Sequence, residues 1–288
     1  MTADRGAASF QQEADFRLKQ RMERLAPNLR MAGIDEREFG TGNCLIGRLS
    51  DRSFIESSEF RNLGVIVEHC RGDENLIIAA REGNSGLANL RVACYGSGNL
   101  IYVGPNCRIA GLIRMHSSDS TCVLGGNNRE PSPFNPTLWS KNTAIVIGSR
   151  TTSNGSQLIA MGDGASIIIG QDCMFSVGVW LKTSDMHAIV DLETHQPINR
   201  HGNIGSIAIG RHVWLGQDVL VALGVEIGAG AIVGAKSFVN RNVESCSLVA
   251  GVPARVLRKG VTWTRAHKLL KDEYALVREE LGFKPEGQ

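Results

Sequence analysis

The chain has 288 residues, 42% of them hydrophobic, so it is long enough to bury one continuous core. Its 31 basic and 29 acidic residues are balanced, which argues against a nucleic-acid-binding protein, and its 7 cysteines form no CxxC pair, which argues against a zinc site or a disulfide framework. The first residues lack the apolar run of a signal peptide and no apolar stretch could span a bilayer, so we expect a cytoplasmic protein.

The first expected element is a helix over residues 8–26. Its apolar stripe consists of Ala14, Leu18, Met22 and Leu25, and Pro27 is expected to end it. The opposite face is basic, which leaves weak membrane-surface association open, although packing against the rest of the protein is the favoured interpretation; the cations are Arg17, Lys19, Arg21 and Arg24. Residues 34–64 have no clear pattern, so residues 1–64 are assigned to an N-terminal helix and an irregular segment.

The main feature of the chain is a period of six residues. Aliphatic side chains recur at Ile209, Leu215, Val221, Ile227, Val233 and Val239, and a second aliphatic or small series recurs four residues after each. An α-helix needs spacings of three and four, whereas short strands joined by tight corners repeat in this way along a coil. The same phase occurs upstream at Ile169, Phe175 and Leu181, and it continues to His187. Cys107 and Cys173 occupy core positions of the pattern, so they are interpreted as buried apolar residues.

Four stretches carry a resemblance to a known family. "DCMFSVGVWLKTSDMH", "IGRHVWLG", "IVGAKSFV" and "VAGVPARVLR", in this order, resemble the hexapeptide-repeat acyltransferases, most strongly from about Ile167 to Arg258. The resemblance implies an all-β core, namely a left-handed parallel β-helix over residues 65–258, and the apolar stripes at the two ends of the chain predict an α-helix on each side of it. It also implies a homotrimer with active sites between its subunits.

Two interruptions of the coil and one terminal element complete the expected organisation. "GGNNREPSPFNPTLWSKN" is rich in proline and asparagine, which predicts a loop near residues 120–143. A second loop spans residues 188–206, and loops of this length inside a domain are usually functional or disordered. Residues 259–288 form the last segment, in which a helix is expected from Thr264 to Leu281, before Gly282.

His187 is the candidate general base, because the period of six stops at this residue and a long loop begins. A histidine can accept the proton of an attacking hydroxyl near neutral pH, and in the resembling family the catalytic histidine lies at the corresponding place. Asp185 could orient the imidazole, or it could be a solvated loop carboxylate. Asp191 and Glu193 in the loop are competing orienters, and His195 and His201 are expected to be surface residues.

The remaining candidate residues concern a coenzyme. Trp214 and Trp180 each precede an inward residue and are therefore expected to point outward. The resemblance implies acetyl-CoA as acyl donor, lying in a groove between coils, with Trp214 near its reactive end. Small residues suited to its pantetheine arm are Gly216, Gly234 and Ala235, and its phosphates are expected to meet Arg241, Arg255 and Arg258.

These observations favour an acetyl-CoA-dependent O-acetyltransferase that acts on a sugar or polysaccharide and needs no metal. An N-acetyltransferase of an amino sugar is the first alternative, because the same base serves an amine. A metal enzyme like the γ-type carbonic anhydrases would need three converging histidines, and a non-catalytic scaffold would bind no coenzyme. The acceptor-binding segment of the family has no counterpart here, so the acceptor is left open.

Overall fold

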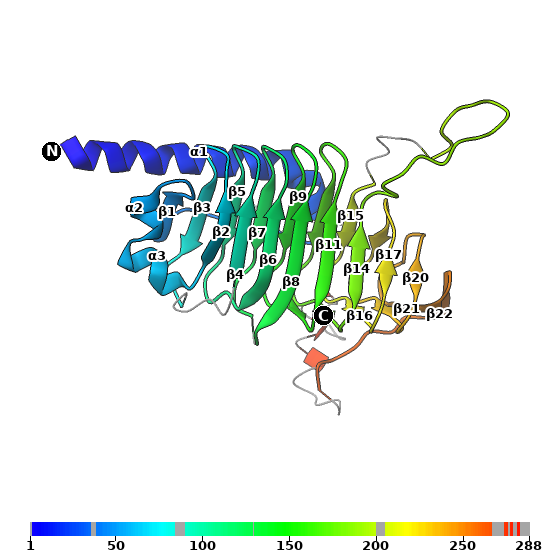
Figure 1. The fold of residues 1–288 in the computed structure, drawn as a ribbon. Coiled ribbons are helices and arrows are strands. Elements are labelled where there is room, and N and C mark those ends of the chain that lie inside the picture. The colour runs from blue at the N-terminus through cyan, green and yellow to red at the C-terminus, as the bar shows by residue number, and fades with distance from the viewer. Residues whose placement is uncertain are drawn as a thin grey trace.

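The computed structural model describes residues 2–35, 39–83, 90–128, 130–199, 205–266, 274–275, 277–278 and 281–282. Its centre is a parallel β-solenoid in which successive coils add strands to three sheets (Figure 1). The coil of short strands predicted from the period of six, and the left-handed parallel β-helix that the family resemblance implies, are confirmed. Among the described strands, those of the solenoid pair in parallel, and antiparallel pairs occur at its two ends, between β1 and β3 and between β21 and β22.

Sheet 1 contains β1 (Cys44–Arg48), β3 (Leu76–Ala80), β5 (Leu100–Val103), β7 (Thr121–Leu124), β9 (Ala144–Ile147), β12 (Ser166–Ile169), β15 (Ile207–Ile209) and β18 (Glu226–Ile227). Sheet 2 contains β2 (Ile66–Cys70), β4 (Leu90–Cys94), β6 (Ile109–Met115), β8 (Ser132–Leu138), β11 (Ser156–Ala160), β14 (Val179–Lys182), β17 (Leu220–Val221) and β20 (Phe238–Val239). Sheet 3 contains β10 (Thr152–Ser153), β13 (Met174–Phe175), β16 (Trp214–Leu215), β19 (Ile232–Val233), β21 (Ser247–Gly251) and β22 (Ala254–Lys259). The chain therefore passes from sheet 2 to sheet 1, then to sheet 3, and back to sheet 2.

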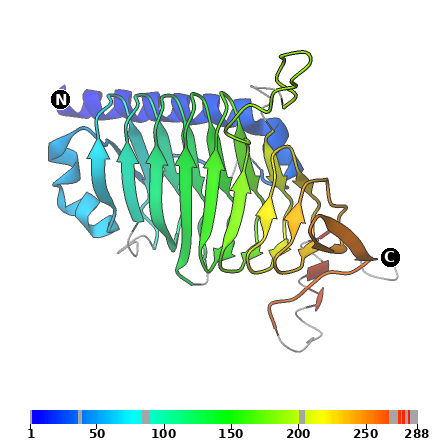
Figure 2. The same ribbon diagram turned by 45° about the vertical axis from the view of Figure 1, so that its right-hand side comes forward.

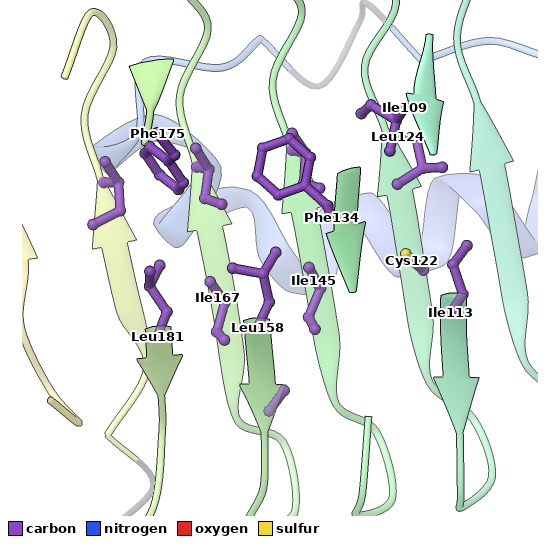
Figure 3. Packing of buried hydrophobic residues seen from close by; sticks show 14 of the residues in the cluster. Ile109, Ile113, Cys122, Leu124, Phe134, Ile145, Leu158, Ile167, Phe175 and Leu181 are labelled. Atoms are coloured by element: carbon purple, nitrogen blue, oxygen red, sulfur yellow. The ribbon is translucent and has the colours of Figure 1, made fainter. Parts of the chain in front are cut away.

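The aliphatic residues of the period stack in columns inside the coils. Leu181 pairs with Val221, and Val221 pairs with Val239, in successive strands of sheet 2. These three residues are at most 1% exposed, and the corresponding columns of the other sheets are equally buried. Figure 3 shows the same arrangement in earlier coils, where side chains from facing sheets meet in the interior. The phase predicted from the sequence is confirmed.

Helix α1 (Thr2–Met31) lies along the outer face of sheet 1 (Figures 1 and 2). Its stripe packs on sheet-1 residues such as Ile78, Val123 and Val146, so these strands are buried on both faces. This explains their continuous apolar runs, which are typical of parallel strands covered on both sides. The buried stripe consists of Ala14, Leu18, Met22, Leu25 and Leu29.

The structure changes one expectation for α1 and supports another. The helix does not end at Pro27 but continues to Met31, because Leu29 still packs into the cluster beneath it. The burial of Leu29 offsets the loss of one helical hydrogen bond at Pro27, which has no backbone N–H to donate. The basic face also has partners: Arg17 donates to the carbonyl oxygens of Glu74 and Gly98 at 2.9 Å, and Arg21 donates to that of Asp119. Packing of this face against the solenoid, rather than exposure to a membrane surface, is what the contacts support.

The segment without a clear sequence pattern covers the first coil. Strand β1 is followed by α2 (Arg52–Ile55), whose N-cap Asp51 accepts from the amides of Ser53 and Phe54. Helix α3 (Ser58–Leu63) then buries Phe60 and Leu63 in the core cluster. These elements close the open end of the solenoid.

The loop expected near residues 120–143 is wrong in part. Strands β7 and β8 lie within this stretch, and β8 includes Pro133 and Pro136. Phe134, Pro136 and Leu138 are buried while Pro133 and Asn135 are only partly covered, so the stretch alternates like its neighbours. Core packing of alternate side chains therefore overrode a composition that ordinarily indicates a loop.

The C-terminal segment also differs from the expectation. Residues Thr264 to Ala266 are not helical, and Trp263 before them is 5% exposed. Most of the expected helix lies outside the described residues, although residues 274–275 and 277–278 are helical. Within the described part of the chain, no helix is both long and apolar enough to cross a membrane.

Candidate active site

His187 lies at the root of an arm, defined here as residues 184–199, that leaves the solenoid after β14 of sheet 2 (Figure 1). The last anchored residue is Thr183, which is fully buried and whose hydroxyl donates to the carbonyl of Met161 at 2.8 Å. Met186 then adopts a φ of 70°, in the left-handed region that non-glycine residues rarely occupy. The chain turns away from the coil there. His187 is consequently exposed and not part of the core column.

Asn199 holds the root of the arm together. Its side-chain amide donates to the carbonyl oxygen of His187 at 2.8 Å and to the carboxylate of Asp185 at 3.2 Å. Its own oxygen accepts from the amide of Ile189 at 2.5 Å. Asp185 is thus linked to His187 through Asn199, and its direct contact with the imidazole stays a prediction.

The outer part of the arm is a short antiparallel hairpin. Val190 bridges Pro197, and the amide of Ile198 donates to the carbonyl of Ile189 at 2.8 Å. Asp191 closes the tip: the amide and hydroxyl of Thr194 and the amide of Glu193 donate to its carboxylate, and these bonds lower its pKa. This engagement gives Asp191 a structural role at the tip.

The arm carries exposed apolar side chains. Leu192 is 87% exposed and Ile198 is 64% exposed, and Met186, Ile189 and Val190 are each about half exposed. Such a concentration on a projecting segment is typical of a contact with another molecule. His195 is exposed near the tip, and His201 lies outside the described residues.

Trp214 points outward on sheet 3, as expected, but it is only partly exposed. Trp263 packs beside it, with ring centroids 6.2 Å apart. The indole N–H of Trp214 is buried and has no hydrogen-bond acceptor among the described residues. Buried donors are nearly always paired, which makes this N–H a candidate donor to a ligand. Trp180 also points outward, with the amine of Lys182 4.9 Å from its ring centroid.

Gly216 and Gly234, which were assigned to the pantetheine part of the coenzyme, must also be small because neighbouring coils approach them closely. A side-chain carbon on Gly216 would lie 2.7 Å from the amide nitrogen of Ala235 in the next coil, and one on Gly234 would lie 2.8 Å from the side chain of Ala250. Coil stacking alone therefore demands glycine at both positions. Ala235 is exposed and could border a ligand.

The three candidate phosphate-binding arginines are exposed. Arg255 and Arg258 lie on β22, where Arg258 pairs with Leu248 of β21. Arg241 lies elsewhere, on the turn that follows β20. Within the described part of the chain, the guanidinium groups of Arg241 and Arg258 make no hydrogen bond or ion pair, and Arg255 donates only to the neighbouring carbonyl of Ala254 at 2.9 Å.

The candidates fall into two groups at different places on the triangular cross-section. Asp185, His187 and Arg241 lie where the chain passes from sheet 2 to sheet 1, and Arg241 is two coils beyond the arm. The second group lies on sheet 3 or where it leads to sheet 2, and consists of Trp214, Gly216, Gly234, Ala235, Arg255 and Arg258. Sheet 3 is the side of the triangle opposite the first group. One chain by itself does not bring the two groups together.

Several residues that the sequence reasoning missed are prominent in the structure. Asn199 is one, and its only sequence signal is its place in the polar loop after His187. The others are Asp172, His212, Trp263 and Arg265, which form a buried polar cluster beside Trp214. No group of three histidine, cysteine, aspartate or glutamate side chains suited to a metal ion occurs in the described part of the chain.

Sequence similarity to known proteins covers part of the chain. No family model matches it. It is 34% identical over 135 residues to a polysialic acid O-acetyltransferase of Escherichia coli O1:K1, an alignment that covers 46% of this chain and 43% of that protein. The chain thus spans less than half the length of that relative. It is 33% identical over 125 residues to a probable macrolide acetyltransferase of Lysinibacillus sphaericus, covering 38% of this chain and 69% of the relative.

Among solved structures, the polySia-specific acetyltransferase NeuO superposes with a TM-score of 0.60 at 23% identity, over 77% of this chain and 99% of that one. At this identity the likeness establishes the fold alone. The fold, the order of the motifs and the similarity to acetyltransferases agree. The chain belongs to the hexapeptide-repeat acyltransferase family.

Proposed function

We propose that the protein transfers the acetyl group of acetyl-CoA to a hydroxyl group of a sugar or polysaccharide, with His187 as the general base. The observation that carries the proposal is the presentation of His187. Its side chain leaves the core column and is exposed at the root of an arm whose backbone Asn199 holds in place. The similarity to a protein named as a polysialic acid O-acetyltransferase supports a glycan acceptor.

In this reaction the imidazole of His187 accepts the proton of the acceptor hydroxyl as the oxygen attacks the thioester carbonyl carbon. The carbon–sulfur bond breaks, coenzyme A leaves as its thiolate, and the imidazolium returns the proton to the sulfur. Such base catalysis contributes about 10²- to 10⁴-fold to the rate. No covalent acetyl-enzyme is required. The unpaired indole N–H of Trp214 would donate to an acceptor atom at the reactive end of the coenzyme.

The two groups of candidate residues are consistent with a homotrimer whose sites lie between subunits. If His187 and Trp214 act on one coenzyme, they must come from two copies, because they lie on opposite parts of one solenoid. Arg241 would then come with His187, while Arg255 and Arg258 would come with Trp214. The exposed apolar residues of the arm, such as Leu192, would be covered by the neighbouring copy. A head-to-tail contact of this kind closes into a ring when its rotation closes.

An N-acetyltransferase is the remaining alternative, because the base would serve an amine equally well. The test is transfer from radiolabelled acetyl-CoA to a panel of polysialic acid, other capsular polysaccharides, amino sugars and a macrolide. Mild alkali then cleaves an O-acetyl ester but leaves an N-acetyl amide intact. We expect alkali-labile label on a glycan. Label that survives alkali would replace the O-transfer proposal, and no transfer to any acceptor would refute an acetyltransferase of this specificity.

A further inference from the structure

The segment after β22 runs back along the solenoid and is held at each coil that it passes. This strap, defined as residues 260–266, follows the corner between sheet 1 and sheet 3. The amide of Val261 donates to the carbonyl of Cys246 at 2.9 Å, and the hydroxyl of Thr262 donates to the carbonyl of Gly230 at 3.0 Å. Trp263 and Arg265 contact the corners of the next two coils. The indole N–H of Trp263 donates to the carbonyl oxygen of His212 at 2.9 Å, and the guanidinium of Arg265 donates to the carbonyl oxygen of Cys173 at 3.0 Å.

The strap is fastened by a cluster centred on His212. The imidazole is 2% exposed and stacks on the indole of Trp263, with ring centroids 4.3 Å apart and planes 7° apart. Its Nδ1 lies 2.8 Å from a carboxylate oxygen of Asp172, and its Nε2 lies 2.9 Å from the carbonyl oxygen of Trp263. Arg265 binds the other oxygen of Asp172 at 3.2 Å.

Both nitrogens of His212 face groups that can only accept hydrogen bonds. A neutral imidazole has one donor and one acceptor nitrogen, so it can make only one of these two bonds. The ring makes both when it carries two protons. Burial alone would raise the pKa of Asp172, but the hydrogen bond from His212 and the charge of Arg265 outweigh it and hold that pKa below the ordinary value, so Asp172 is an anion at neutral pH.

Among the described residues, the charged groups that surround the ring are the carboxylate of Asp172 and the guanidinium of Arg265. Asp172 faces it from the corner before β13, and Arg265 faces the same carboxylate from the strap. Cys173, beside Asp172, stays neutral because burial raises the pKa of its thiol to about 12. Removing the proton on Nε2 would turn a lone pair of His212 toward the carbonyl oxygen of Trp263 and break the bond that fastens the strap.

The strap connects both ends of the proposed coenzyme site. It starts where β22, with Arg255 and Arg258, ends, and it places Trp263 against Trp214. We propose that the strap is a pH-dependent positioning element for the coenzyme, fastened while His212 carries two protons and released when His212 loses one. This inference rests on the proposed function, because it assumes that Trp214 and the arginines of β22 contact the coenzyme.

The test measures binding of coenzyme A alone to the full-length protein by calorimetry, from about pH 5.5 to about pH 9, where a histidine changes its charge. The phosphates of the ligand titrate in part of this range, so the comparison is between variants at each pH. We expect the wild-type Kd to rise by about fivefold or more toward high pH, the lower end of typical couplings between sites. His212→Gln should bind weakly at every pH without this rise. His195→Gln, an exposed histidine of the arm, should retain the wild-type profile.

A second variant tests the contact between the strap and Trp214 without removing the imidazole of His212. Trp263→Phe keeps the backbone carbonyl that His212 binds but loses the indole N–H and part of the contact with Trp214. It should bind coenzyme A more weakly while the rise with pH persists. A His212→Gln profile parallel to that of the wild type, or an unchanged affinity in Trp263→Phe, would overturn the inference. If the wild type bound no coenzyme A at any pH, the proposed function would fail instead.

Discussion

The chemistry proposed for single residues depends on how His187 is presented to solvent. Met186, with its left-handed backbone, turns the chain out of the coil, and the side chain of Asn199 then binds the carbonyl of His187. The core column is buried up to Leu181, whereas the imidazole of His187, six residues later, is exposed. A histidine that served only to fill the core would be buried, so a purely structural role does not account for this position. Two substitutions test the residues on either side of this hydrogen bond.

Replacement of the base should separate turnover from coenzyme binding. His187→Ala is expected to lower kcat by about 10²- to 10⁴-fold, the usual contribution of a general base, and to leave the Kd of coenzyme A nearly unchanged. The acid limb of the pH–rate profile should disappear with it. The matched control is His195→Ala in the same arm, for which steady-state kinetics should resemble the wild type. Wild-type turnover in His187→Ala would contradict the assignment.

Asn199 is expected to act by positioning rather than by contact with the reacting atoms. Asn199→Ala removes the three hydrogen bonds that join Asp185, the His187 carbonyl and the Ile189 amide. A displacement of the base by about 1 Å can cost about 10²-fold in rate, so kcat should fall by up to that amount while the acid limb of the pH profile persists. The melting temperature should change little, because the root of the arm is exposed. A pH profile that loses its acid limb would assign Asn199 a direct role.

At the scale of elements, the arm and the strap are held in place by different contacts. Each leaves the regular coil and must be held without a strand ladder. The arm is held at its root by one asparagine and closed at its tip by Asp191. The strap is held by backbone carbonyls of successive coils and by the buried cluster of Asp172, His212 and Arg265. The strap should therefore contribute to global stability in a pH-dependent way.

The acid side of this dependence follows from Asp172. Because its pKa in the folded protein is lowered, its contribution is present above the ordinary carboxyl value of about 3.9 and is lost as the pH falls through the folded value. At neutral pH, Asp172→Asn should destabilise by about 3 kcal/mol, since it leaves the largely buried guanidinium of Arg265 without its carboxylate partner.

Urea unfolding of the wild type and of Asp172→Asn, from neutral pH to about pH 3, checks this expectation. The difference in unfolding free energy between the two proteins should shrink as the pH falls. Asp163→Asn, at an exposed position, is the control and should show almost no difference at any pH. A difference that stayed constant over the range would mean that the carboxylate of Asp172 contributes through shape and not through its charge.

At the scale of the whole molecule, stability resides in the columns that run through the coils. Val239 is 1% exposed and stacks on Val221, while the next residue, Asn240, is exposed. Val239→Asp should cost about 3–5 kcal/mol by burying an unpaired charge, and Asn240→Asp should stay within about 0.5 kcal/mol of the wild type. Chemical denaturation of the pair measures both. Equal stabilities would reject the assignment of inward and outward positions.

The proposed sharing of sites between copies can be tested by complementation. His187→Ala and Trp214→Ala proteins should each be nearly inactive, but any mixed trimer in a cyclic arrangement contains one interface with both residues intact. Random co-assembly after co-expression should therefore restore about a quarter of the wild-type activity. Sedimentation should show a trimer in every case. Mixed trimers without recovered activity would place His187 and Trp214 in the same subunit's site or in none.

The sequence by itself determined the repeating part of this protein. The period of six is a local property, because each residue's inward or outward direction follows from its place in one coil, and so the columns through Leu215, Val221 and Ile227 could be read directly. The end of the period at His187 likewise marked the exposed root of the arm, and the motif order indicated the family. The same local reasoning failed at Pro133 and Pro136, where composition indicated a loop but the packing of Phe134 and Leu138 kept a strand.

Only the tertiary structure decided which distant residues meet. His212 binds Trp263, which follows it by 51 positions, and Arg265 binds Asp172 across 93 positions. No periodicity joins these pairs, because the strap leaves the repeat and returns along another corner. The separation of His187 from Trp214 is likewise a property of the triangular cross-section, which puts successive strands on different sides. Local spacing determines the direction in which a side chain points, whereas its partners depend on the path of the whole chain.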